Sequence, residues 1–156
     1  MNDIEKVLEL ICGLEKEFCM TMRDNYACWP GVCGIAANVL MIYLKKIAMD
    51  KHKIDIDDIA DVCTGEYRWD EYTIGHQWIQ IGSLMIDPTY EQFDIAYKNK
   101  IRIVSDTRYR LESTNKTMKR YKKIMDLVVV NDSASILVGY INMCGDTDKK
   151  EHIGTQ

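Results

Sequence analysis

The chain has 156 residues, of which 47% are hydrophobic and 28% are charged, and its net charge is −4. This length and composition predict one globular domain that can bury a core without disulfide or metal support. No run of 18 apolar residues occurs, so the sequence predicts no membrane-spanning helix.

The N-terminal segment predicts a helix over residues 3–21. Asn2 and Glu5 have the spacing of a capping box. Apolar residues then recur at helical spacing, at Ile4, Val7, Leu8, Ile11, Leu14 and Phe18. The segment Arg23 to Val32 contains Pro30 and Gly31, which cannot continue this helix, and it is therefore expected to be a loop.

The six cysteines indicate the cellular compartment. They are Cys12, Cys19, Cys28, Cys33, Cys63 and Cys144. The N-terminus lacks the basic and apolar regions of a secretory signal peptide. We therefore expect free thiols and a cytoplasmic location, or delivery into the cytosol of another cell. Cys12 and Cys19 lie in the first helical pattern and are expected to be small buried residues.

A second helix is expected to begin near Cys33. An apolar stripe at helical spacing defines it, formed by Ala36, Val39, Leu40, Tyr43, Leu44 and Ile47. One turn before Ala36 lies Cys33, so its thiol stands at the N-terminal end of the buried stripe. A helix start favours a thiolate, and the neighbours Gly31 and Gly34 leave room for a substrate.

The middle of the chain predicts a mostly antiparallel sheet. Strands are expected at 62–67, 75–81, 84–89 and 101–104. They are followed by a short basic helix at 117–125, an apolar run at 127–130 and a final helix at 133–143. The order of elements is α+β, with N-terminal helices packed on the sheet. Residues 1–144 form the domain and 145–156 a polar tail.

The hairpin around Gly82-Ser83 brings a histidine and an aspartate together. A two-residue turn pairs Ile81 with Leu84, which places His76, Trp78 and Asp87 on one face of the sheet. His76 and Asp87 are then diagonal neighbours, close enough for a carboxylate to orient an imidazole.

Cys33, His76 and Asp87 have the residue types of a thiol nucleophile, its base and the group that orients the base. The alternatives are a buried structural cysteine and a surface His-Asp pair. Cys28 is the rival thiol. A zinc site formed by Cys28, Cys33, Cys63 and His76 is less favoured, because no second close pair of ligands follows. Neither a metal nor another cofactor is expected.

These residues resemble the transglutaminase-like superfamily, a branch of the papain-like cysteine hydrolase fold. The resemblance lies in Cys33 at a helix start, His76-Gln77-Trp78 on one strand and Asp87-Pro88-Thr89 on the next. It implies a papain-like core with Cys33 as nucleophile, His76 as general base and acid, and Asp87 as orienting group. The implied activity is that of an amide hydrolase or acyltransferase acting on a peptide or protein through a thioester, as in peptidases, deamidases and transglutaminases.

The groups that would contact the substrate are less defined. Trp29 and Asn25 are the candidates for the side-chain oxyanion donor, and Trp78 is expected to contact a bound peptide. The same fold could also serve as a non-catalytic module that binds a peptide or protein. Iodoacetamide would discriminate between the two functions, because a catalytic Cys33 reacts faster than the other thiols.

A basic segment covers residues 98–123. Ten Lys and Arg stand against Asp106 and Glu112 there, a net charge of +8, so the remainder carries −12. The segment is either a solvated face or a docking surface for an acidic partner. Nucleic acid is not expected as a partner, because no aromatic platform accompanies the charge.

Overall fold

The computed structural model describes residues 1–25 and 32–115 of the chain. The first helix, α1 (Asp3–Asn25), begins at the predicted capping box, where Glu5 N donates a hydrogen bond to Asn2 Oδ1 at 2.8 Å. The second helix, α2 (Cys33–His52), begins at the predicted residue. From Ile35 to Leu44 it is buried on almost every side, because it packs against both α1 and the sheet.

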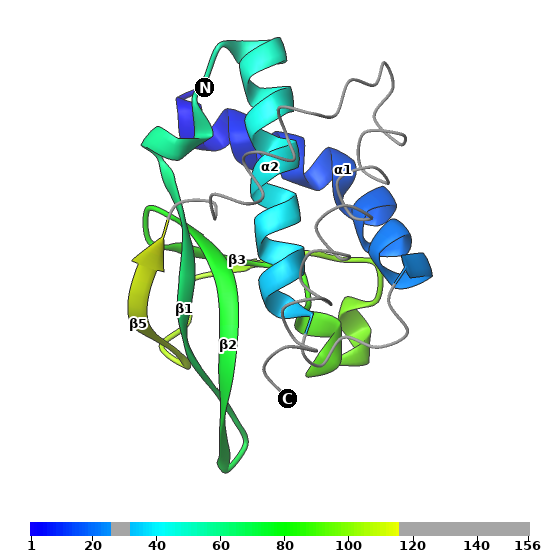
Figure 1. Cartoon of the computed structure of the whole chain (residues 1–156), viewed down its shortest axis with the longest axis vertical. Coiled ribbons are helices and arrows are strands. Elements are labelled where there is room, and N and C mark those ends of the chain that lie inside the picture. The colour runs from blue at the N-terminus through cyan, green and yellow to red at the C-terminus, as the bar shows by residue number, and fades with distance from the viewer. Residues whose placement is uncertain (26–31, 116–156) are drawn as a thin grey trace, which may run out of the picture.

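Within the described residues the sheet has five strands, all antiparallel, in the order β4-β3-β2-β1-β5. The strands are β1 (Ala60–Trp69), β2 (Tyr72–Ile81), β3 (Leu84–Asp87), β4 (Arg102–Val104) and β5 (Tyr109–Asn115). Short 3-10 turns precede β1 and join β3 to β4. In Figure 1 both helices lie together, and β1 and β2 extend well past the start of α2. The α+β class is therefore confirmed, whereas the papain-like core remains a prediction.

The two sides of the sheet carry different packing. The side facing the helices contributes aliphatic residues, which with the helices form the aliphatic core; its strand members are Ala60, Val62, Ile79, Ile81 and Ile86. The opposite side carries the aromatic cluster, whose rings are Tyr67, Trp78, Tyr90, Phe93, Tyr97 and Tyr109. Because side chains alternate along a strand, neighbouring residues of β2 belong to different sides.

Some sequence expectations need correction, and others lie outside the described residues. Helix α1 continues past its predicted end at residue 21 to Asn25, into the segment that was expected to be a loop. Cys19 is buried, but Cys12 is exposed, because it lies off the buried stripe of α1 formed by Val7, Ile11, Leu14, Phe18 and Met22. Strand β5 was not predicted. The expected elements at 117–125, 127–130 and 133–143, and the tail at 145–156, lie outside the described residues.

Candidate active site

The β2–β3 hairpin positions a histidine beside an aspartate. Its two-residue turn gives the predicted register, with Ile81 opposite Leu84 and Ile79 opposite Ile86. Gly82 has φ +60°, a conformation that glycine adopts without strain. His76 Nε2 lies 2.7 Å from Asp87 Oδ2, and both residues are buried. The carboxylate therefore fixes the imidazole orientation from the Nε2 side.

Asp87 is fully buried, and its two oxygens are held by further donors. Thr89 donates its backbone N–H to Oδ1 at 3.1 Å and its hydroxyl to the same oxygen at 3.4 Å. The Tyr109 hydroxyl donates to Oδ2 at 2.8 Å. Burial and the Asp87 carboxylate raise the pKa of Tyr109 well above its usual range, so the phenol stays protonated and remains a donor. These bonds compensate for the removal of a carboxylate from water.

The hydrogen-bond network that begins at Asp87 continues from Tyr109 to Arg102. Its guanidinium donates to the Tyr109 hydroxyl at 3.4 Å and to Asp106 at 3.1 Å, and it lies 4.2 Å from the centre of the Tyr90 ring. The Arg102 side chain is only 11% exposed. Hydrogen bonds from Arg108 and Arg102 lower the pKa of Asp106 to about 2 despite its burial. Arg102 is therefore an internal support of the site.

Cys33 reaches His76 at an open edge of β2. The pairing of β2 with β3 begins at Ile79, so no neighbouring strand lies beside His76 on that side in the described residues. The first turn of α2 packs against this part of β2. Gly34 comes so close to the strand that a Cβ added to it would lie 3.0 Å from the Gln77 side chain. The Cys33 thiol is partly exposed, and it lies close enough to the His76 imidazole to raise the pKa of that ring. Since Asp87 occupies Nε2, Nδ1 is the nitrogen left for the thiol.

The charge of His76 depends on both neighbours. Burial alone lowers the pKa of His76, but the Asp87 carboxylate, and then the Cys33 thiol, raise it to about 9. The ring stacks on Trp78, with centroids 6.1 Å apart at 25°, and meets Phe93 edge-on at 5.2 Å. The imidazole is therefore protonated at neutral pH. It lies near the Cys33 sulfur and packs against aromatic rings.

The structure therefore brings Cys33, His76 and Asp87 together. It does not bring Trp78 to a surface where a peptide could contact it: the ring is completely buried, and it supports His76 from within the aromatic cluster. Asn25 is the last residue of α1, and nothing is described of its side chain. Trp29 and the rival thiol Cys28 lie in 26–31, outside the described residues.

No cluster of three metal-ligating side chains occurs among residues 1–25 and 32–115. Among the three cysteines of the zinc alternative, Cys63 is completely buried, and burial raises the pKa of its thiol to about 11. Its sulfur contacts Asp61 O and Gln80 Oε1. Cys63 is therefore a structural residue of the sheet, and the proposed zinc set is not assembled within the described part of the chain.

The basic segment at 98–123 is not one surface. Arg102 is internal, and Arg108 Nη2 pairs with Asp106 at 2.7 Å. Lys98 and Lys100 are exposed, and residues 116–123 lie outside the described ranges. Charge counting alone could not separate an arginine that stabilises the aromatic cluster from lysines that face water.

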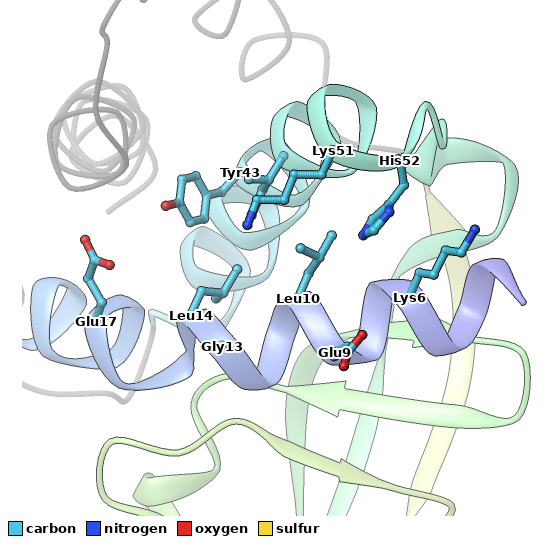
Figure 2. Close-up of a pocket in the computed structure, with 10 residues that line it drawn as sticks. Lys6, Glu9, Leu10, Gly13, Leu14, Glu17, Tyr43, Lys51 and His52 are labelled. Atoms are coloured by element: carbon cyan, nitrogen blue, oxygen red, sulfur yellow. The ribbon is translucent and has the colours of Figure 1, made fainter. Parts of the chain in front are cut away.

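A hollow of about 420 Å³ lies between α1 and α2, as Figure 2 shows. Lys6, Glu9, Glu17, Tyr43 and His52 are among its lining residues. His52 ends α2 and Cys33 begins it, so this end of the hollow is about 30 Å along the helix from the thiol. The hollow is therefore separate from the candidate active site.

Sequence reasoning missed Tyr109 and Arg102, although both complete the support of Asp87. A signal was present: from Arg108 to Ser113, charged residues alternate with Tyr109, Leu111 and Ser113, which is the pattern of a strand with two different faces. Thr89 was noted only as part of Asp87-Pro88-Thr89, and its hydrogen bonds to Asp87 give it a function.

None of the helices in the described residues is long and apolar enough to span a membrane. Comparison of the chain with protein-family models, curated proteins and solved structures found no match.

Proposed function

We propose that this protein is a cysteine-nucleophile enzyme acting on amides, a hydrolase or acyltransferase of peptidase or glutamine-deamidase type on a papain-like, transglutaminase-like core. The observation that carries the proposal is the His76 imidazole, which is hydrogen-bonded to the buried Asp87 carboxylate and lies near enough to the Cys33 thiol for that thiol to raise its pKa. A thiol, a base and an orienting acid in this order are what nucleophilic catalysis by cysteine requires.

The helix start supports the same chemistry. No acidic residue occupies the first turn of α2, and Val32 provides no side-chain cap. The partial positive charge at the helix N-terminus is therefore available to a thiolate and to the oxyanion of a tetrahedral intermediate. Cys12, Cys19, Cys33 and Cys63 are all free, as a reducing cytoplasm would keep them.

The reaction divides into two steps. The Cys33 thiolate, whose proton is held by His76, attacks the amide carbonyl carbon, and the His76 imidazolium gives that proton to the leaving nitrogen as the C–N bond breaks. This leaves a thioester on Cys33 and neutral His76. His76 then removes a proton from water, or from an amine, which attacks the thioester and releases the acyl group. Asp87 stabilises the imidazolium and keeps its orientation throughout.

Alkylation kinetics test this proposal without a known substrate. Iodoacetamide at pH 7 should modify Cys33 at least about tenfold faster than Cys12, because a thiol placed beside an imidazole base is the arrangement of an activated cysteine nucleophile. Cys12 is the matched control, since it is an exposed free thiol of the same chain. Peptide mapping by mass spectrometry gives both rates in one sample. Equal rates for the two thiols would contradict the proposal, and His76→Gln should remove the difference.

A further inference from the structure

Helix α2 covers only part of the helix-facing side of the sheet. Its first turn rests on Gln77, as the close approach of Gly34 to that side chain shows. The same side of β2 continues through Gly75 and Thr73, which are both exposed. Figure 1 shows this part of the β1–β2 hairpin extending beyond the start of α2.

A hollow of about 420 Å³ lies on this uncovered part of the sheet, and we call it the arginine pocket. Its lining residues are Glu66, Arg68, Thr73, Thr107, Arg108 and Arg110. Cross-strand pairing sets the group in place, with Arg68 opposite Thr73 and Arg110 opposite Glu66. Three arginines, one glutamate and two threonines therefore line the same hollow.

Two of the three arginines are available to a ligand. The Arg108 guanidinium is bound to Asp106 and lies 5.3 Å from the Tyr67 ring centre, so this side chain is held in place and forms one side of the pocket. Arg110 has a 75% exposed side chain and forms an exposed ion pair with Glu66 at 3.7 Å, which is weak enough for a ligand oxyanion to replace. Arg68 is exposed and forms no ion pair within the described residues. A guanidinium in such a position binds carboxylate or phosphoryl oxygens in pairs.

The arginine pocket and the first turn of α2 lie on the same side of β2. Gln77 and Thr73 are four residues apart on β2, which is about 13 Å at roughly 3.3 Å per residue. Gly75 lies between them, and a Cβ added there would have no atom within 4 Å, so the described structure leaves this part of β2 open. An extended peptide of about four residues would bridge the two positions.

We propose that the arginine pocket binds an oxyanion of the substrate, so that the enzyme acts on acidic peptide segments. A carboxylate or phosphoryl group about three to five residues from the attacked amide would contact Arg68 and Arg110. This inference rests on the proposed function and adds to it the class of substrate.

Electrophilic peptides provide the test. Iodoacetyl-Ala-Ala-Glu-Glu-amide and Glu-Glu-Ala-Ala-Lys(iodoacetyl)-amide present the acidic residues in both chain directions. Each is compared with its Gln and phosphoserine counterparts. For every protein variant, the rate of Cys33 modification is divided by the rate with iodoacetamide, so changes in the intrinsic reactivity of the thiol cancel.

We expect a Glu peptide in one direction to react about fivefold faster than its Gln counterpart at low salt. The preference should shrink at about 0.5 M salt, where exposed charges are screened. Arg68→Gln combined with Arg110→Gln should abolish it. Lys98→Gln combined with Lys100→Gln removes the same charge away from the pocket and should preserve it. A preference confined to phosphoserine peptides would support the pocket and identify phosphoryl as the source of the oxyanion.

Equal rates for all peptides, with Cys33 still more reactive than Cys12 toward iodoacetamide, would overturn the inference and leave the proposed function standing. A preference that survives in the double arginine variant would also overturn it. If Cys33 shows no enhanced reactivity even with iodoacetamide, the proposed function fails and the inference fails with it.

Discussion

Each side of the sheet in this protein carries a buried cluster, but the two clusters differ in chemistry. The aliphatic core joins the sheet to α1 and α2 through Val, Leu and Ile side chains. The aromatic cluster surrounds His76, Asp87 and several hydroxyl groups. Aliphatic packing is non-directional and provides stability, whereas each buried polar atom needs a specific partner. The aliphatic side therefore stabilises the fold, and the aromatic side holds the buried charged groups.

Replacing Cys33, the proposed nucleophile, should separate activity from stability most completely. Cys33→Ala should abolish turnover of any amide substrate, because the proposed reaction passes through a thioester on Cys33. The free energy of unfolding should change by less than about 1 kcal/mol, since the residue is partly exposed at a helix start. Substrate assays and urea denaturation measure the two effects. Cys12→Ala is the control and should retain turnover; activity remaining in Cys33→Ala would show that another thiol is the nucleophile.

A substitution in the aliphatic core should do the opposite. Leu40→Ala should lower the free energy of unfolding by about 2–5 kcal/mol, because Leu40 is completely buried in α2 and its removal leaves a cavity. Molecules that remain folded should still alkylate Cys33 at the wild-type rate. Denaturation and iodoacetamide kinetics on one preparation check this. A large loss of thiol reactivity without loss of stability would mean that the two sides are not independent.

The pH dependence of stability should come from the aromatic side. The pKa of His76 is about 9 in the folded protein and about 6.5 in an unfolded chain. The folded state therefore binds the extra proton between these values, so this stabilisation is complete below about pH 6.5 and is lost as the pH rises through 9. Urea denaturation from pH 6 to 10 should show wild type losing a few kcal/mol relative to His76→Gln. If the free energy of unfolding changed with pH in the same way in both proteins, a contribution of His76 protonation to stability would be excluded.

The smallest expected effect concerns the support of Asp87. Tyr109→Phe removes one of the four hydrogen bonds to the carboxylate and should slow Cys33 alkylation about threefold to tenfold, at a cost of about 1–2 kcal/mol in stability. Tyr97→Phe is the matched control, since Tyr97 borders the same cluster without a hydrogen bond to Asp87 among the described residues. Identical behaviour of both variants would remove Tyr109 from the site.

Local patterns were sufficient to predict the elements that carry the three central residues. Pro30 and Gly31 followed by an apolar stripe located the helix start at Cys33, and Gly82-Ser83 defined the hairpin register. These features depend on residues close together in the chain, where turn chemistry and periodicity act directly.

The remainder depended on contacts between distant residues. Tyr109 reaches Asp87 only because β5 pairs with β1, across a shift in register at Thr64 and Gly65. A Cβ on Gly65 would lie 2.0 Å from Arg110 O, so glycine is required for that approach. Neither the pairing nor the shift has a local sequence signature. The aromatic rings around Arg102 could not be predicted either, because an arginine in a basic segment is expected to face water.

We infer that the Cys33 thiol and the Asp87 carboxylate together raise the pKa of His76. NMR titration of the His76 imidazole in wild type and in Cys33→Ala tests it most directly, with His52 and His152 as the other two histidine signals. We predict that His76 titrates near pH 9 in wild type and at a lower pH in Cys33→Ala, because the thiol is one cause of the raised pKa. Titration near 6.5 in both proteins, or an identical raised value in both, would contradict the account.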